Sequence, residues 1–245
     1  MSAIVVCYER QNELNDINKA IDPASEWNPH YINADPKNIR KIENQILENE
    51  AYFLICSKNF SDEIAHHLHE LYTRNPLLTI IYFYSVLKER EFVELHKAGI
   101  KYCFVGETRK SNLKAALTKL SRGHWKKIPT SLYPVDYIDL VPRAKKTLKF
   151  IENTPLKYCN TETIAHFLNI SQSHFRKEFK KYFDRPFRNF KQELIQHYEN
   201  ILLFEKKLRP HHIYSILDYK NLSAFSRSFK ARHGVNWQNM IKSAN

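Results

Sequence analysis

Residues 173–183 read SHFRKEFKKYF, and residues 223–233 read SAFSRSFKARH. The two stretches are copies of one pattern, in which serine, phenylalanine, a cation, a second phenylalanine and lysine recur at the same offsets. The matching pairs are Ser173 and Ser223, Phe175 and Phe225, Lys177 and Arg227, Phe179 and Phe229, and Lys180 and Lys230. The rest of the chain can be interpreted as the scaffold that presents this repeat.

Each copy predicts an amphipathic helix. At about 100° per residue, the first copy places its aromatic residues on one side and its polar residues nearly opposite. The aromatic side comprises Phe175, Phe179, Tyr182 and Phe183, and the polar side Ser173, Lys177 and Lys180. In the second copy we expect Leu222, Phe225 and Phe229 to be buried and Ser223, Ser226, Arg227 and Lys230 to be exposed. Each helix therefore has a basic face that suits an anionic partner.

The positive charge of the chain is concentrated in its second half. The formal net charge is +12, and residues 138–245 hold 20 Lys and Arg against 9 Asp and Glu. A basic domain of this kind indicates a polyanion, and nucleic acid is favoured over a membrane because no stretch reaches about 18 consecutive apolar residues. A merely solvated basic surface is the alternative. The N-terminus shows no secretory signal, so we expect a cytoplasmic protein.

The four cysteines are Cys7, Cys56, Cys103 and Cys159. They are widely spaced and form no CxxC pair or Cys/His ligand pattern, which argues against a zinc site and against a disulfide framework. We therefore expect buried free thiols, no metal and no cofactor.

Residues 1–124 predict five strands that alternate with five helices. The apolar runs are 3–7, 27–32, 51–56, 77–84 and 102–105, and the helical stretches are 9–20, 37–47, 62–73, 87–97 and 112–122. This alternation predicts an α/β, doubly wound, five-stranded parallel sheet. The order and sizes of the elements resemble the receiver domain of bacterial response regulators, a flavodoxin-like fold.

The resemblance implies a phosphorylation site at the ends of the strands, with an aspartate as acceptor, but most of that chemistry is missing. The degenerate site comprises Glu9, Cys56, Ser57 and Ser85. An acyl phosphate requires a carboxylate, and a divalent cation requires oxygen ligands, so we expect a receiver-like domain that is not phosphorylated. Asp62 as a displaced acceptor is the alternative, and it would make the chain a phospho-signalling protein. A redox pair of Cys7 and Cys56 is a further alternative to two packed thiols.

Prolines and weak periodicity predict a linker at 125–139, followed by a second domain at 140–245. This domain predicts a short helix from Asn160 or Thr161, a turn and a basic helix capped by Ser171. The same plan recurs from Pro210, with Asn221 as the second cap. A long helix over 187–204, with Phe190, Leu194, Ile201 and Leu202 as candidate buried residues, would join the two parts. The sequence therefore predicts an all-α domain with two helix-turn-helix units.

Two such units that each end in Phe-x-(Lys/Arg)-x-Phe-Lys resemble the DNA-binding domain of the AraC/XylS family of transcription regulators. The resemblance implies that the base-reading positions are Ser173, Arg176, Lys177, Ser223, Ala224, Ser226 and Arg227. Lysine and arginine beside a groove give affinity without sequence information, so Lys180, Lys181, Lys230 and Arg232 are assigned to phosphates. The sequence departs from the family pattern at Asp184 and Asp218, where glycine is usual, and at Tyr214, where the residue is usually small.

These patterns predict a transcription regulator that binds double-stranded DNA at specific sites and catalyses no reaction. RNA polymerase is a further candidate partner, and a non-specific architectural or RNA-binding protein is the alternative. We also expect a homodimer through the fourth helix, fifth strand and fifth helix of the first domain. This face combines Phe92, Val93, Leu95, Glu89, Glu91 and Glu94 with Arg109, Lys110, Lys114 and Lys119. Charges that stay solvated, or that pair within one subunit, are the alternative to such a contact.

Overall fold

The computed structural model describes residues 2–21, 27–33, 39–134 and 141–243. The chain forms two compact units, Met1–Gly123 and His124–Asn245. In the sequence the first unit holds 16 Lys and Arg against 16 Asp and Glu, and the second holds 22 against 10. The whole excess of positive charge therefore belongs to the second unit. Among the described residues, no helix is long and apolar enough to cross a membrane.

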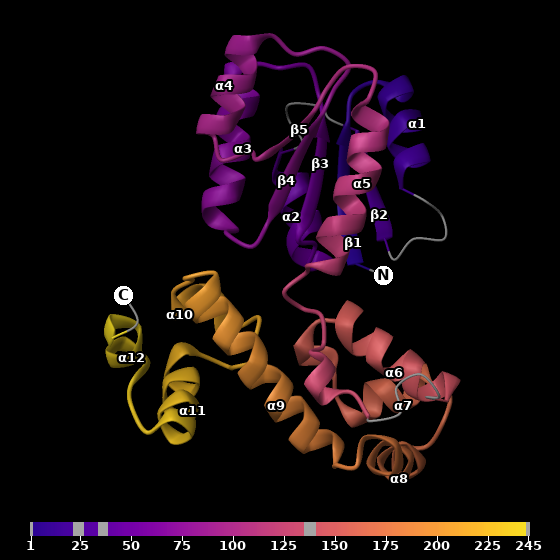
Figure 1. Ribbon diagram of the computed structural model, residues 1–245, viewed down its shortest axis with the longest axis vertical. Helices are drawn as coiled ribbons and strands as arrows, with labels where there is room; N and C mark the ends of the chain where they lie inside the picture. Colours follow the sequence, from indigo (N-terminus) through magenta and orange to yellow (C-terminus); the bar gives the residue numbers. More distant parts are fainter. Residues whose placement is uncertain (1, 22–26, 34–38, 135–140, 244–245) are drawn as a thin grey trace. The chain divides into compact units, whose positions relative to one another are not determined.

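The first unit is built on five parallel strands (Figure 1). They are β1 (Ser2–Tyr8), β2 (Trp27–Asn33), β3 (Phe53–Ser57), β4 (Thr79–Phe83) and β5 (Tyr102–Phe104). All neighbouring strands pair in parallel, in the order β2-β1-β3-β4-β5. This is the order of flavodoxin-like doubly wound sheets, so the predicted fold class is confirmed.

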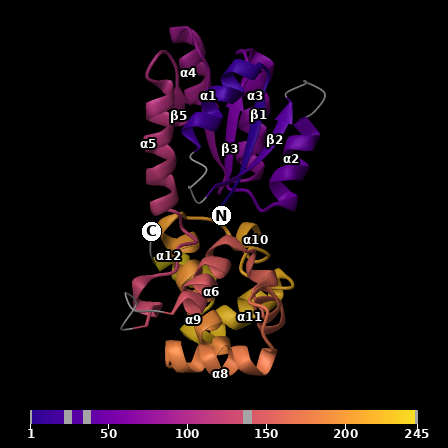
Figure 2. The same ribbon diagram turned by 90° about the vertical axis from the view of Figure 1, so that its right-hand side faces the viewer.

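Helices cover both faces of the sheet because the side chains of each central strand alternate between two apolar layers. Ile4 and Val6 of β1 face α1 (Gln11–Ala20) and α5 (Arg109–Arg122). Val5 and Cys7 lie in the opposite layer, with α2 (Ile39–Glu48), α3 (Asp62–Arg74) and α4 (Glu89–Lys97). The view in Figure 2 shows the sheet between α5 and α2. The continuous apolar runs of the sequence therefore predicted correctly that helices cover both faces of the sheet.

The second unit is helical. Its elements are η2 (Thr130–Leu132), α6 (Pro142–Asn153), η4 (Leu156–Tyr158), α7 (Thr161–Phe167), α8 (Gln172–Phe183), α9 (Phe187–Asn200), η5 (Ile201–Glu205), α10 (Pro210–Ile213), α11 (Leu222–His233) and α12 (Trp237–Ser243). Short α7 precedes basic α8, and short α10 precedes basic α11. The two predicted helix-turn-helix segments are therefore present in this unit, with α9 between them (Figure 1).

The long helix predicted over 187–204 ends differently from the expectation. The α-helical part stops at Asn200, and the chain continues through a π-helical turn, Ile201–Glu205. Leu202 and Leu203 are buried, whereas Ile201 is only half-buried. A π-turn is wider than an α-turn, so it rotates the following side chains away from the positions that a regular helix would give them.

The segment predicted to be a linker belongs, in its described part, to the helical unit. Trp125, Ile128 and Leu132 are buried. The Trp125 ring packs edge-on against Tyr198 of α9 with 5.3 Å between centroids, and the Tyr198 hydroxyl donates to the Lys126 carbonyl. Aromatic and aliphatic residues on both sides of Pro129 supply this packing. The unit boundary accordingly lies between Gly123 and His124, and residues 135–139 of the predicted linker are outside the described part.

Candidate nucleic-acid interface

Helix α8 begins and ends at defined backbone signals. The Ser171 hydroxyl accepts a hydrogen bond from the His174 amide at 3.2 Å, as predicted for the cap. Its buried face carries Phe175, Phe179 and Phe183. These rings pack on the start of α9, where Phe179 lies 5.3 Å from Phe190 between ring centroids. Aromatic packing therefore fixes which face of α8 points outward.

The outward face of α8 is basic. Ser173, Arg176, Lys177, Lys180 and Lys181 are all exposed. Arg176 contacts the Gln172 amide oxygen at 3.4 Å, and Lys181 lies over the Tyr182 ring. Within the described part of the chain, none of these four cations has a carboxylate partner. Their charge is therefore available to an external anion.

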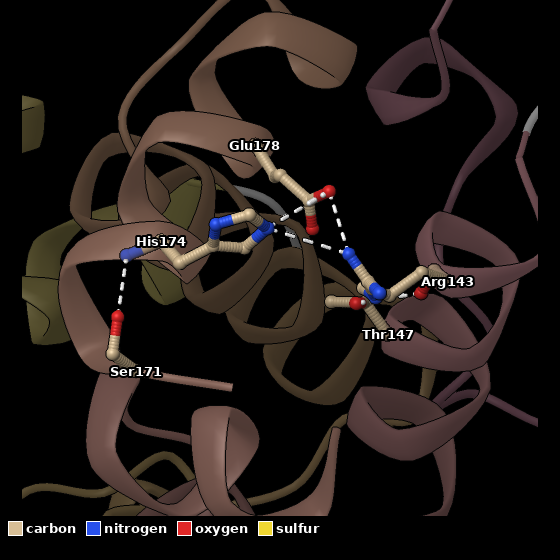
Figure 3. A network of polar contacts seen from close by, with 5 residues as sticks. All are labelled: Arg143, Thr147, Ser171, His174 and Glu178. Carbon is tan, nitrogen blue, oxygen red and sulfur yellow. Dashed lines mark hydrogen bonds and ion pairs between the residues drawn. The ribbon is translucent and has the colours of Figure 1, made fainter. Parts of the chain in front are cut away.

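A polar network that the sequence analysis missed ties α8 to α6, and it neutralises Glu178, the acidic residue within α8 (Figure 3). Arg143 donates to Glu178 Oε1 at 2.7 Å, and His174 Nε2 lies 3.2 Å from the same oxygen. The hydrogen bond from Arg143 lowers the pKa of Glu178 below its ordinary value. The i, i+4 spacing of His174 and Glu178 was a usable signal, but nothing local pointed to Arg143.

Helix α11 repeats this design. The Asn221 side chain accepts from the Ala224 amide at 2.8 Å, and Phe225 and Phe229 are fully buried. Ser223, Arg227 and Lys230 are exposed as predicted, while Ala224 and Ser226 are half-buried. Leu222 was expected to be buried, but it is 38% exposed. As the first residue of the helix it lies beyond the aromatic packing, and it lines a cavity instead.

Two residues assigned to DNA have partners within the unit. The Trp237 indole of α12 donates to the Ser226 hydroxyl at 3.1 Å. Arg232 donates to the Ser228 hydroxyl and forms an ion pair with Glu199, which is fully buried at the end of α9. The structure thus gives Arg232 a role in attaching α11 to α9. Its assignment to a phosphate remains a prediction that this ion pair weakens.

The turns around the basic helices use left-handed backbone conformations. The φ angles are 54° at Asn169, 52° at Asp184, 67° at Asp218 and 73° at Gly234. Asp184 and Asp218 are the two positions where the resemblance implies glycine, so the backbone requirement is retained although the residue differs. Lys191 of α9 also pairs with Asp218 at 2.8 Å. Tyr214 is half-buried, and its carbonyl accepts from the Tyr219 amide within the second turn.

The degenerate phosphorylation site lies at the carboxyl ends of β1 and β3. Cys7 and Cys56 are register partners, and both are buried. The hydrogen bond with Cys7 and burial raise the pKa of Cys56, which favours the protonated thiol. The redox pair of Cys7 and Cys56 stays an untested alternative. Ser57 is fully buried, and its hydroxyl has no hydrogen-bond partner among the described residues. The acceptor position therefore presents no carboxylate.

The remaining groups of this site also have local roles. The Glu9 carboxylate accepts from the Asn59 amide at 2.9 Å, and the Ser85 carbonyl accepts from the Gly106 amide at 3.1 Å. Asp62 is the first residue of α3, directly after the capping Ser61. As a displaced acceptor it stays an untested alternative.

Only some residues of the predicted dimer face are exposed and unpaired within the described part of the chain, and could therefore contact a second subunit. Phe92 and Val93 are 46% and 44% exposed, but Leu95 is fully buried in the sheet layer and cannot contribute. Arg109 pairs with Asp16 of α1 at 2.6 Å, and Lys110 reaches the same carboxylate at 3.3 Å. These two cations are therefore paired within the unit. Lys114 and Lys119 are exposed.

The comparisons with known proteins concern the fold. No family model matches the chain, and no curated protein matches its sequence. A CheY-like protein (TadZ) from Pseudomonas aeruginosa is 16% identical, with 49% of this chain and 99% of that chain covered and a TM-score of 0.42. The Salmonella typhimurium response regulator RcsB is 16% identical, with 74% and 91% covered and a TM-score of 0.43. RcsB from Salmonella enterica serovar Typhimurium bound to promoter rprA is 15% identical, with 73% and 89% covered and a TM-score of 0.40. At these identities and scores the similarity is one of fold alone.

Proposed function

We propose that this protein is a transcription regulator that binds specific sites on double-stranded DNA through α8 and α11. The observation that carries the proposal is the duplicated design of these helices. Each has a polar N-cap, a buried phenylalanine pair and an exposed basic face, and each follows a short helix and a turn. A helix presented in this way can enter the major groove, where Arg and Lys read guanine edges.

The arrangement of α9 supports a two-part reading of DNA. Its first residues, Phe187 and Phe190, pack on α8, and Glu199 near its end pairs with α11. A helix of 14 residues is about 21 Å long. We propose that α9 holds α8 and α11 so that they read neighbouring segments of one site, as the resemblance to AraC/XylS regulators implies.

Within this proposal the contacts divide into two classes. Arg176, Lys177 and Arg227, with the neighbouring Ser173, Ser223, Ala224 and Ser226, are proposed to face bases. Lys180, Lys181 and Lys230 are proposed to contact phosphates. The receiver-like unit, without a carboxylate at its acceptor position, is proposed to act in regulation or dimerisation rather than in phosphoryl transfer. RNA polymerase remains a further proposed partner.

In vitro selection of DNA sites with the full-length protein tests this function, followed by affinity measurements on the selected site and on random DNA. We expect Arg176→Ala or Arg227→Ala to cost about 1–3 kcal/mol on the selected site only. Lys180→Ala should weaken both DNAs alike, and Lys19→Ala on the exposed side of α1 should change neither. A selection that returns no preferred site would favour the architectural alternative, and unchanged preferences in both arginine variants would refute the assignment of α8 and α11.

A further inference from the structure

A cavity of about 590 Å³ lies in the helical unit where η5, α10, α11 and α12 come together. Its apolar lining includes Leu203, Phe204, Leu222, Trp237 and Ile241. Small-molecule sites typically measure about 300–1,000 Å³ and have mostly apolar walls. None of the side chains proposed to contact DNA lines this cavity, so its composition needs a separate explanation.

The charged residues of the lining, Lys207 and Arg209, have the same sign. His211 also belongs to the lining, and no aspartate or glutamate does. All three side chains are exposed. Within the described part of the chain, neither Lys207 nor Arg209 forms an ion pair. An apolar hollow with uncompensated cations at its edge is complementary to a molecule that has an apolar body and an acidic group.

The backbone around the cavity departs from regular geometry at two successive places. Residues Ile201–Glu205 form the π-helical turn, and Lys207 adopts φ 54° although it is not glycine. The Leu208 amide then returns to the Leu202 carbonyl at 2.9 Å. Such irregularities occur at functional sites as well as at the ends of helices. Here the segment that contains them supplies Leu203, Phe204 and Lys207 to the cavity lining.

We propose that this cavity binds a small amphipathic organic anion. The apolar body lies against Phe204, Leu222 and Trp237, and the acidic group lies beside Lys207 and Arg209. A neutral apolar molecule would gain only the burial of its surface. A cation with the same apolar body would be repelled by the edge of the cavity.

An occupant of this cavity touches residues that position α11. Leu222 is the first residue of α11, and the Trp237 indole donates to Ser226 on the same helix. The bound anion therefore biases the seating of α11 on α12. This consequence for DNA rests on the proposed function, whereas binding of the anion does not.

Isothermal titration calorimetry of the full-length protein tests binding with three probes that share one tail: octanoate, octanol and octyltrimethylammonium. We expect octanoate to bind most tightly and the cation least. Asparagine tolerates the left-handed backbone at position 207, so Lys207→Asn removes the charge without new strain. Lys207→Asn and Arg209→Gln should each lower the affinity for octanoate about threefold, and the double variant about tenfold. Lys206→Gln, next to the cavity but outside its lining, is the matched control and should leave binding unchanged.

Equal affinities for the three probes, or octanoate binding that the double variant retains, would overturn the site. Binding to phosphatidylglycerol vesicles without binding to free octanoate would also overturn it, in favour of a lipid surface. DNA titrations with and without octanoate give an independent result. An unchanged DNA affinity at saturating octanoate refutes the coupling alone, and an absence of specific DNA binding refutes the proposed function while the calorimetry still decides the cavity.

Discussion

Arg232 offers a sharp test, because its sequence pattern and its structural contacts imply different roles. The sequence assigns it to a DNA phosphate. In the structure it forms an ion pair with Glu199, whose side chain is fully buried, and His233 Nε2 lies 3.3 Å from the other carboxylate oxygen. The perturbation is Arg232→Ala, which leaves a buried carboxylate with only the neighbouring imidazole as a partner.

The expected loss of stability follows from this geometry. Removing one partner of a buried ion pair typically costs about 3–5 kcal/mol. The Arg232 side chain is 25% exposed and His233 remains beside Glu199, so the cost should be smaller. We expect the free energy of unfolding of the helical unit to fall by about 2 kcal/mol. Glu199→Gln, which removes the buried charge but keeps the shape, should cost less.

The dependence on pH gives a second signature of the same ion pair. Burial raises the pKa of Glu199, and Arg232 opposes that rise. Without Arg232 the folded-state pKa rises further, so the folded variant binds a proton that the unfolded chain releases. Stability then falls as pH increases through that pKa. The difference in the free energy of unfolding between the wild type and Arg232→Ala should therefore be smaller near pH 5 than near pH 8.

Hydrogen exchange of the full-length protein measures the effect in α9 and α11 directly. A loss of about 2 kcal/mol corresponds to roughly thirtyfold faster exchange of amides that open with the whole unit. Amides of the β-sheet unit serve as the internal control and should not change. Unchanged exchange in α9 and α11, combined with weaker binding to any DNA, would refute the structural role and restore the phosphate assignment.

Three further predictions concern other parts of the chain. Asp184 has a left-handed backbone conformation, which glycine adopts without steric strain. Asp184→Gly should therefore raise the free energy of unfolding by about 0.5 kcal/mol, and Asp184→Ala should lower it. Equal denaturation midpoints for the two variants would contradict this prediction. Acetyl phosphate should leave the intact mass unchanged, since Cys56 and Ser57 occupy the acceptor position, and a phosphoryl adduct would support the displaced acceptor. If the receiver-like unit dimerises, reversing Lys114 and Lys119 to glutamate should weaken self-association in sedimentation; a wild-type chain that stays monomeric at high concentration would remove that hypothesis.

The β-sheet unit could be predicted because its signals are local. Each central strand is apolar on both faces, so the sequence alone indicates that helices must cover both faces of the sheet. The caps at Ser171 and Asn221 were likewise recognisable, because a cap acts within three residues of itself. The repeat located both basic helices and their outward faces without any knowledge of the three-dimensional packing.

Contacts between distant segments could not be predicted in this way. Arg143 meets Glu178 from another helix, 35 residues away, and Arg232 meets Glu199 across 33 residues. A helical wheel shows only that such a side chain points away from its own helix. It does not show whether the side chain contacts water, DNA or a neighbouring helix. The packing of Trp125 on Tyr198 could not be predicted for the same reason, since these two residues are far apart in the sequence.

Three departures from the expected pattern lie between the end of α9 and the start of α11. Ile201, the first residue of the π-turn, was expected to be buried and is half-buried. Leu222 was expected to be buried and is exposed, and Lys207 holds a backbone conformation that lysine disfavours. Leu222 and Lys207 both line the cavity that η5 borders, although left-handed residues also occur elsewhere in the unit, at Asn169, Asp184 and Asp218. Those three residues lie in the turns around the basic helices, where the backbone requires that conformation. An exposed leucine and a left-handed lysine at one cavity are departures that the proposed binding of a ligand, rather than stability, would explain.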